Sequence, residues 1–358
     1  MIYFIINPAA GSGQGKEASP VIERLMNDKG AAYSIIFTQK PDDFDRVYGL
    51  IDYDIAQTIV CVGGDGTIQE YVGLAAGRDV NFCIIPVGCG NDLMYSLPGG
   101  VVKIRSLEDK IAYYAGRIDL CQTIAVDAAK VNGRYYFNIA GTGVDIQVLR
   151  DALPLKKRFG GFAYFIALVK NVLTYRAERM AITIDAGAGA GDTTAGGAEA
   201  GGAASGDAVA GSATAEVAVS VGAEAGGAAS GDAGAGSATA GGAVSAGAEP
   251  ESDEFTVLAV CNGAYYGGHM KICPPSVIDD GLLTICKIRK MPRLKMVAMF
   301  PLVKSGGHTR LKEVSFVNCS SIKVEFDGKK TINLDGNLYD MESPLTFAVL
   351  KGAVRLIV

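Results

Sequence analysis

A glycine-rich bend that carries one acid is the stretch of this chain best suited to chemistry. "VGGDGT" places Gly63 and Gly64 after an apolar run, with Asp65 inside the bend. Glycines let bare backbone approach a ligand, and the N–H groups that open a following helix attract anions. A carboxylate beside phosphate is repulsive unless a divalent cation lies between them or the acid accepts a hydroxyl proton. The motif therefore predicts a phosphate-binding loop; an ordinary strand-to-helix turn capped by Asp65 is the simpler alternative.

Two further turns carry acids that could take part in chemistry. Asp279 and Asp280 lie together between two predicted strands, and paired acids can hold Mg²⁺ or Ca²⁺. Asp335 stands at the end of a predicted strand, directly before Gly336. Acids are also common in solvated turns, and residue types alone favour that interpretation at both positions.

The elements that must position the bend form an alternating pattern. Residues 58–62 are apolar and β-branched, as in a strand covered on both faces. Thr67 and Glu70 fit a capping box, which predicts that a helix starts at Thr67. Alternating strands and helices predict a parallel sheet with helices on both faces and ligands at the strand C-terminal ends. Further strands are predicted in residues 1–7, 32–38 and 81–92, and a helix in residues 20–29.

The first strand is followed by "PAAGSGQGKE", a second glycine-rich turn. Its spacing matches neither a Walker A loop nor a dinucleotide fingerprint, so alone it is a weak signal. From about residue 121 the pattern changes to alternation with an Asn132-Gly133 hairpin signal, and several strands follow residue 250. The second half therefore predicts an antiparallel β-rich domain that also holds one helix, in residues 159–175.

Residues 186–250 differ in composition from the rest of the chain. They are almost entirely Gly, Ala, Ser, Thr and acids, and an 18-residue stretch from Ala198 recurs from Ala223 with one change. Since no large apolar side chain is present to build a stacked core, a flexible, disordered insertion is predicted rather than a solenoid. It holds seven acids and no Lys or Arg, so the formal charge of −5 becomes +2 for the remainder. The folded body is thus expected to tolerate an anionic surface.

Cysteines, histidines and hydropathy exclude several classes of protein. The eight cysteines form no CxxC pair and there are only two histidines, which argues against a zinc site. Free thiols in a reducing cytosol are the simplest account. The N-terminus has no basic region before its apolar run, so no signal peptide is predicted. No apolar run approaches about 18 residues, so no membrane span is predicted.

Taken in order, five motifs resemble the diacylglycerol kinase catalytic domain family, which includes bacterial lipid kinases, sphingosine kinases and ceramide kinases. They are "NPAAGSGQG", "VGGDGTIQE", "PVGCGND", "CNGAYYGGHMKICPPSVIDDGLLTI" and "LDG". GGDGT alone is shared with NAD kinases and phosphofructokinases, but the ordered set covers nearly the whole chain outside the insertion. The resemblance implies a three-layer α/β nucleotide-binding domain in residues 1–120 and an antiparallel β-sandwich in residues 121–342, interrupted by the insertion. A final strand in residues 343–358 would return to the first domain.

The resemblance also implies roles for individual residues. Asp335 would accept the proton of the lipid hydroxyl, with Asp65 as a second catalytic acid. Asp280 would bind a structural Mg²⁺ together with the carbonyls of Val277 and Leu282. The implied contacts to ATP are Asn7, Thr38, Gly63, Gly64, Asp65, Gly66, Thr67 and Cys89.

Two positions depart from the family pattern. Cys89 stands where the family commonly has Thr, and a thiol is a weaker hydrogen-bond donor than a hydroxyl. Asn337 stands where bacterial members commonly have Glu, and an amide cannot accept a proton near neutral pH. Asp335 is retained, so activity is still expected.

The sequence thus predicts an ATP- and Mg²⁺-dependent lipid kinase that transfers the γ-phosphate to a lipid hydroxyl, diacylglycerol-like or sphingoid. The alternatives are an NAD or sugar kinase of the same superfamily, or a catalytically degenerate nucleotide-binding protein. We expect a cytoplasmic protein, peripherally associated with a membrane, with no nucleic-acid partner and possible homodimer formation. Either membrane contact or an ordinary solvated surface would explain the basic stretch Lys287, Arg289, Lys290, Arg293 and Lys295.

Overall fold

The computed structural model describes residues 1–39, 42–88, 90–98, 100, 102–159, 162–185 and 250–358. Every element named below belongs to one compact unit of the chain. The predicted insertion lies outside the described residues except for Pro250, and so does Cys89. No helix in the described ranges is both long enough and apolar enough to cross a membrane.

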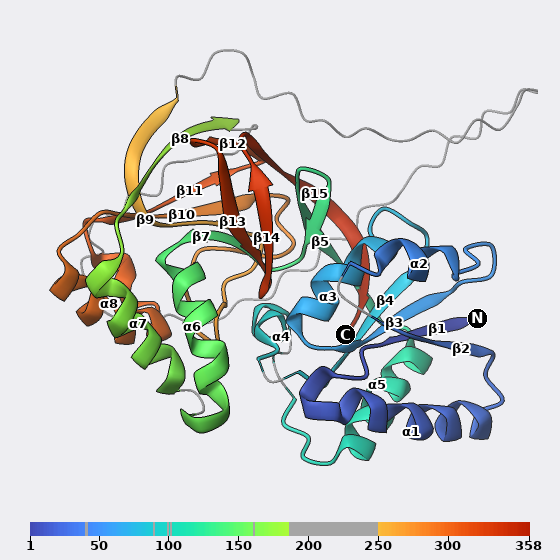
Figure 1. Ribbon diagram of the computed structural model, residues 1–358. Helices are drawn as coiled ribbons and strands as arrows, with labels where there is room; N and C mark the ends of the chain where they lie inside the picture. The colour runs from blue at the N-terminus through green and yellow to red at the C-terminus, as the bar shows by residue number, and fades with distance from the viewer. Residues whose placement is uncertain (40–41, 89, 99, 101, 160–161, 186–249) are drawn as a thin grey trace, which may run out of the picture. The chain divides into compact units, whose positions relative to one another are not determined.

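The N-terminal half is built on a parallel sheet in the order β4–β3–β1–β2. Helices α1 and α5 lie on one face of this sheet, and α2 and α3 lie on the other (Figure 1). β1 and β3 are almost wholly buried, as apolar strands between two helical layers should be. The strands are β1 (Ile2–Ile6), β2 (Tyr33–Phe37), β3 (Thr58–Gly63) and β4 (Asn81–Pro86). The helices are α1 (Gln14–Asp28), α2 (Phe44–Gly49), α3 (Asp65–Tyr71), the short α4 (Asp92–Ser96) and α5 (Leu107–Leu120).

Helix α1 begins six residues before the predicted start and runs through Pro20. The glycines ahead of it explain the early start. Gly13 has a φ of 103°, which favours glycine, and a Cβ on Gly15 would lie 1.9 Å from the carbonyl oxygen of Asn7. The first glycine-rich turn is therefore a tight connection that packs α1 directly against the end of β1.

The C-terminal half is antiparallel, which confirms the predicted combination of an α/β part with a β-sandwich. Its core includes Phe255, Leu258, Ile322 and Leu334, all nearly inaccessible to solvent. β8 and β9 are antiparallel neighbours in the sheet. The strands are β5 (Thr123–Val131), β6 (Arg134–Tyr136), β7 (Ile139–Gly143), β8 (Glu178–Asp185), β9 (Glu251–Cys261), β10 (Leu283–Arg289), β11 (Val314–Cys319), β12 (Ser321–Glu325), β13 (Lys329–Leu334) and β14 (Asn337–Glu342).

Three helices pack against the C-terminal half through a separate apolar cluster. They are α6 (Val144–Phe159), α7 (Phe162–Thr174) and α8 (Arg293–Ser305). Val148, Ala167 and Met299, one from each helix, are buried in this cluster with Cys286 of β10. This packing places α6 and α8 at the edge of the cleft described below.

The last strand, β15 (Leu345–Ile357), connects the two halves. It pairs antiparallel with β12 and β5, and its end pairs parallel with β4 through Arg355 and Asn81. Hydrogen bonding thereby joins the 15 described strands into one continuous sheet.

Candidate functional site

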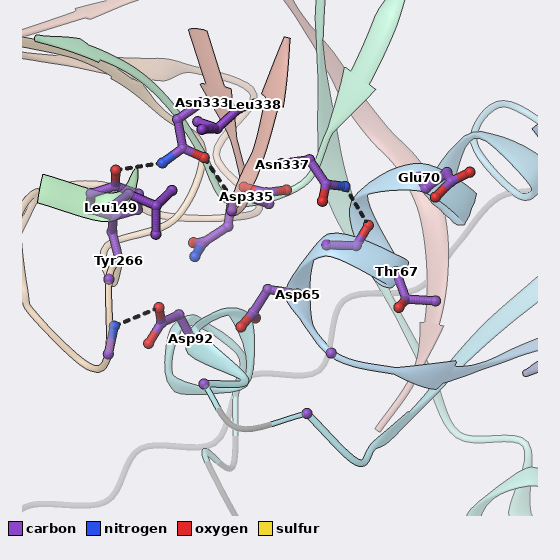
Figure 2. A pocket seen from close by; sticks show the side chains of 18 of the residues that line it. Asp65, Thr67, Glu70, Asp92, Leu149, Tyr266, Asn333, Asp335, Asn337 and Leu338 are labelled. Carbon is purple, nitrogen blue, oxygen red and sulfur yellow. Dashed lines mark hydrogen bonds between the residues drawn. The ribbon is translucent and has the colours of Figure 1, made fainter. Parts of the chain in front are cut away.

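A cleft of about 1420 Å³ is lined by residues from both halves. Asn7, Thr38 and Asp65 come from the N-terminal half, and Asp145 and Asp335 from the C-terminal half. The volume exceeds the roughly 300–1,000 Å³ of a typical small-molecule site, so the cleft has room for two reactants. Figure 2 shows Asp65, Asp92 and Asp335 converging on it.

The glycine bend forms the floor of the cleft on the N-terminal side. A Cβ on Gly88 would lie 2.4 Å from the Cα of Gly64, so two bends touch in a way that only glycine permits. α3 opens at Asp65, which leaves the N–H groups of Asp65 and Gly66 without an intrahelical acceptor. Gly64, Gly66 and Thr67 line the cleft, whereas Gly63 ends β3 behind them.

The predicted capping box is wrong. α3 starts at Asp65, two residues before Thr67, and its first turn has no side-chain cap. The Thr67 hydroxyl instead accepts a hydrogen bond from Nδ2 of Asn7 at 3.0 Å, and Glu70 accepts one from the N–H of Asp43 at 2.8 Å. Thr67 and Glu70 are thus used for long-range contacts, which tie the helix to neighbouring loops.

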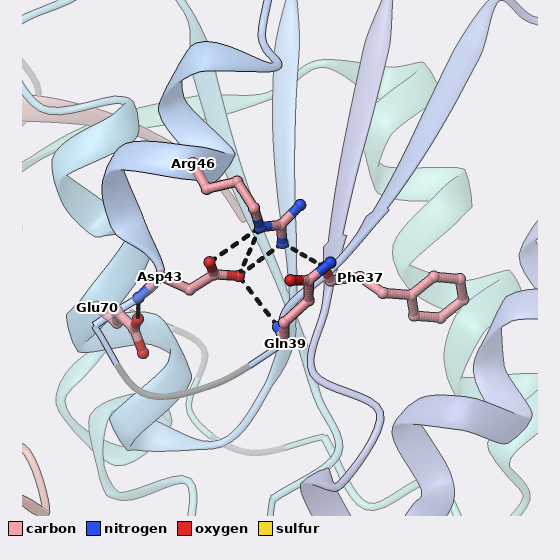
Figure 3. A network of polar contacts seen from close by, with 5 residues as sticks. All are labelled: Phe37, Gln39, Asp43, Arg46 and Glu70. Atoms are coloured by element: carbon pink, nitrogen blue, oxygen red, sulfur yellow. Dashed lines mark hydrogen bonds and ion pairs between the residues drawn. The ribbon is translucent and has the colours of Figure 1, made fainter.

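A polar network fixes the segment that carries Thr38 (Figure 3). Asp43 is buried and accepts hydrogen bonds from Arg46 and from the N–H of Gln39. Arg46 also donates to the carbonyl of Phe37 at 2.7 Å. The N–H of Thr38 in turn donates to the carbonyl of Ile6 at 2.9 Å, which holds Thr38 at the cleft beside the end of β1.

Asp65 and Asp92 are neighbouring acids near the start of α4. Asp65 accepts a hydrogen bond from the N–H of Leu93 at 3.2 Å. Burial and, second, the nearby Asp92 carboxylate raise the pKa of Asp65 to about 6. Asp92 accepts hydrogen bonds from the N–H groups of Gly268 and His269, at 2.9 and 2.6 Å, and so holds a loop of the C-terminal half against the site.

Asp335 is buried at a tight turn, with a φ of 47°. Its oxygens accept hydrogen bonds from the N–H groups of Phe137 at 2.6 Å, Asn138 at 3.1 Å and Ile139 at 2.6 Å. Burial raises the pKa of Asp335 to about 7 against the opposing effect of these bonds, and Asp65 adds to the rise. Within the described residues no Lys or Arg forms an ion pair with Asp65, Asp92 or Asp335; the ring Nδ1 of His269 lies 3.3 Å from Oδ1 of Asp92.

A chain of hydrogen bonds that the sequence did not reveal supports the turn of Asp335. The Tyr266 hydroxyl donates to Oδ2 of Asp145 at 2.7 Å and accepts from Nδ2 of Asn333 at 2.5 Å. Oδ1 of Asn333 accepts the N–H of Gly336 at 2.8 Å. Burial raises the pKa of Asp145 to about 6. Tyr266 and Asn333 lie inside or beside motifs of the family resemblance, but nothing in their spacing indicated this contact.

Asn337 contacts the glycine bend from the opposite side of the cleft. Its Nδ2 donates to the carbonyl of Gly66 at 2.9 Å and to Oε1 of Gln69 at 2.7 Å. Tyr339 also donates to Gln69, and Gln69 donates to the carbonyl of Tyr135. This position, where the family commonly has an acid, is therefore used as a donor in this chain.

The three residues expected at a structural magnesium site share one loop outside the cleft. Asp280 accepts the N–H of Leu282 at 2.8 Å, and Val277 is 48% exposed. Burial, with smaller effects from Asp127 and Asp279, raises the pKa of Asp280. Within the described ranges no three His, Cys, Asp or Glu residues form a ready metal cluster. A cation here would thus need backbone carbonyls or water as further ligands, which is the ligand set that the resemblance implies.

The basic stretch does not form a free positive patch. Lys287 pairs with Glu251, Lys290 with Glu254, and Lys295 with Glu313. Arg289 pairs with Glu251 and Asp253. These four side chains are therefore paired with acids that are distant in sequence.

Comparison with known proteins agrees with the fold. Residues 1–128 match the model of the diacylglycerol kinase catalytic domain, and residues 238–358 match that of the YegS C-terminal NAD kinase beta sandwich-like domain. A diacylglycerol kinase of Mycobacterium tuberculosis is 22% identical over 90% of this chain and 84% of its own length. A Shewanella frigidimarina protein named "Probable lipid kinase YegS-like" is 20% identical over 96% of this chain and 91% of its own length.

A crystal structure of a diacylglycerol kinase from Bacillus anthracis has the same fold, with a TM-score of 0.58 and 19% identity, over 99% of this chain and 96% of that one. The two domain models together match well over half of the chain. The chain therefore belongs to the family of proteins that join a diacylglycerol kinase catalytic domain to a YegS-type C-terminal domain.

Proposed function

We propose that this protein is a lipid kinase that transfers the γ-phosphate of ATP to a lipid hydroxyl with the help of Mg²⁺. The observation that carries the proposal is the convergence of Asp65, Asp92 and Asp335 on a cleft floored by glycine backbone. On the side of α6 and α8 the cleft is lined by apolar side chains, including Val148, Leu149 and Phe300. A phosphate-binding floor and an apolar wall suit a nucleotide and an acyl chain respectively.

The acids at the floor fit a metal-chelated triphosphate. Mg²⁺ is commonly held by one or two carboxylates together with substrate phosphates, and Asp65 and Asp92 offer that pair. The repulsion between these two carboxylates, which contributes to the raised pKa of Asp65, is what such a cation would relieve. When bound, Mg²⁺ would neutralise charge on the transferring phosphoryl group. The free N–H groups of Asp65 and Gly66 would orient phosphate oxygens.

Asp335 is the proposed acceptor of the hydroxyl proton. A base works best when its pKa lies near the working pH, and burial places that of Asp335 at about 7. The three N–H groups fix its carboxylate within the cleft, and the chain from Asp145 to Asn333 fixes the turn that carries it. The acceptor hydroxyl would then lie between Asp335 and the phosphate.

A nucleotide-binding protein without turnover is the second candidate. Asn337 donates to the bend where related proteins have an acid, and three N–H groups already occupy Asp335. This candidate predicts ATP binding with no transfer. An NAD kinase is disfavoured by the apolar wall, since NAD has no acyl chain to bury there.

Transfer from labelled ATP to a panel of diacylglycerol, a sphingoid base, ceramide and NAD tests the proposal. We expect one lipid class to be labelled, only with Mg²⁺. Labelling of NAD alone would establish the rival kinase. ATP binding without any labelled product would establish the non-catalytic candidate.

Replacing Asn337 by Glu tests how this chain holds its glycine bend. Glu has no donor for Gly66 or Gln69 and would place a carboxylate against two acceptor oxygens. We expect a loss of about 1–3 kcal/mol in the free energy of unfolding and weaker ATP binding. Thermal unfolding and ATP titration measure both, with Asn337→Gln as the control that keeps a donor. A gain in turnover would show instead that an acid at this position promotes phosphotransfer.

The loop of Asp280 is proposed to bind a structural Mg²⁺. We expect millimolar Mg²⁺ without ATP to raise the unfolding temperature by about 2–4 °C, because binding to the folded state alone is stabilising. Asp280→Ala should remove this rise, while Asp279→Ala should keep it. If Mg²⁺ raised the unfolding temperature of both variants equally, the cation would bind at a site other than the loop of Asp280.

A further inference from the structure

Helix α8 is apolar on its inner and outer faces. Its inner face buries Met296, Met299 and Val303. On its outer face Leu294 is 84% exposed and Leu302 is 40% exposed. A surface helix normally turns only one apolar face inward, so the exposed apolar side chains of the outer face are not explained by packing within the chain.

The outer face of α8, defined here as Leu294, Ala298, Pro301 and Leu302, follows helical spacing. Positions four, seven and eight residues after Leu294 fall on the same side of a helix, and all four residues are exposed. A contiguous exposed apolar stripe of this kind marks an interaction site more often than chance.

The surroundings of this face carry positive charge. Residues 281–312 contain eight Lys or Arg and no Asp or Glu. Four of the eight are paired with acids from other elements, as described above. Arg293, Lys304, Arg310 and Lys312 are exposed and form no ion pair with any acid of the described chain. Arg293 and Lys304 lie on α8 itself, and Arg310 and Lys312 follow it in the chain. Unpaired cations together with an apolar stripe match an anionic phospholipid surface.

The same helix also borders the cleft. Phe300, Pro301 and Lys304 line it beside Val148 and Leu149 of α6. Pro301 belongs to both the outer face and the cleft lining, so the two surfaces are continuous. A bilayer resting on α8 would therefore meet the cleft mouth at its apolar wall.

We propose that the outer face of α8 docks the protein on an anionic bilayer and so admits the acceptor lipid to the apolar side of the cleft. The admission of an acceptor lipid rests on the proposed lipid kinase function, whereas the docking on the bilayer does not. The helix would lie in the interface plane with Leu294 and Leu302 among the acyl chains and the four cations at the headgroups.

Sedimentation with vesicles tests the docking without ATP or acceptor. We expect binding to vesicles of equimolar phosphatidylcholine and phosphatidylglycerol, weak binding to phosphatidylcholine alone, and release by salt. The double variant Leu294→Asp with Leu302→Asp should bind about tenfold more weakly. Arg310→Glu with Lys312→Glu should lower binding to anionic vesicles only. The control is Leu120→Asp, at a leucine on α5 whose exposure of 69% lies between those of Leu294 and Leu302.

Several outcomes would overturn the docking. Unchanged vesicle binding by the Leu294/Leu302 variant would do so, and thermal unfolding would show that the variant is folded. A parent that forms dimers, binds no vesicles and becomes monomeric on this double substitution would assign the face to a second copy of the chain. Vesicle binding that depends on α8, in a protein that phosphorylates no lipid, would retain the docking and reject the kinase proposal. If the protein phosphorylates a dispersed short-chain acceptor but its vesicle binding does not depend on α8, the kinase proposal would be retained and the docking rejected.

Discussion

Replacing Asp65 by Asn is expected to lower kcat/KM for phosphotransfer by about 10³-fold or more while leaving the fold intact. The amide keeps an oxygen to accept the N–H of Leu93 but removes the charge that would face a metal-chelated phosphate. The replacement also removes a buried charge next to Asp92, whose repulsion contributes to raising the pKa of Asp65 to about 6. We therefore expect the variant to be at least as stable as the parent above neutral pH.

Measuring both quantities separates catalysis from folding. Transfer assays give the loss of activity, and thermal unfolding at pH 8 gives the stability. Asp54→Asn, at an exposed position away from the cleft, is the control. Activity within tenfold of the parent would reduce Asp65 to a turn residue and remove the basis of the phosphate-binding floor.

Replacing Asp335 by Asn is expected to lower activity at least 10²-fold and, unlike the Asp65 change, to destabilise the protein. An amide offers one acceptor oxygen, so its NH₂ group would face the N–H of Phe137 or Ile139. Leaving a buried donor unpaired costs about 1–3 kcal/mol. Asp327→Asn, on an exposed turn, should change neither activity nor stability.

The pH dependence gives Asp335 a second signature. Its pKa in the folded protein is about 7, well above the value of about 3.9 expected when unfolded. The protonated form is thus favoured by folding, and this stabilisation is lost as pH rises through 7. Without ligands the parent should lose about 1–2 kcal/mol between pH 6 and pH 8, and Asp335→Asn should lose less.

Turnover should change in the opposite direction to stability, because the base must be ionised. We expect kcat/KM of the parent to rise through pH 7 and the residual activity of Asp335→Asn to be flat. A parent profile that is flat between pH 6 and pH 8, with a variant that stays active, would assign Asp335 a purely structural role in anchoring its turn.

The strands were predictable because apolar runs such as residues 58–62 are local signals. Helix α8 and strand β14 were missed for different reasons: α8 has apolar side chains on two faces rather than one, and half of the six residues of β14 are polar. The N–H groups that hold Asp335 lie nearly 200 residues away in sequence. Sequence spacing relates only residues that are close along the chain. Neither the burial of Asp335 nor the pairing of Lys287 with Glu251 could therefore be predicted from the sequence alone.

β5 and β15 pair with each other, and the chain enters the C-terminal half through β5 and returns from it through β15. Their register shifts between Leu350 and Val354. There the N–H of Gly352 and that of Gly281 each donate to Asp127 at 2.6 Å. Asp127 of β5 thereby ties the bulge of β15 to the loop that carries Asp280. If that loop binds Mg²⁺ as proposed, we expect the cation to stiffen the point at which the two strands that connect the halves are held together.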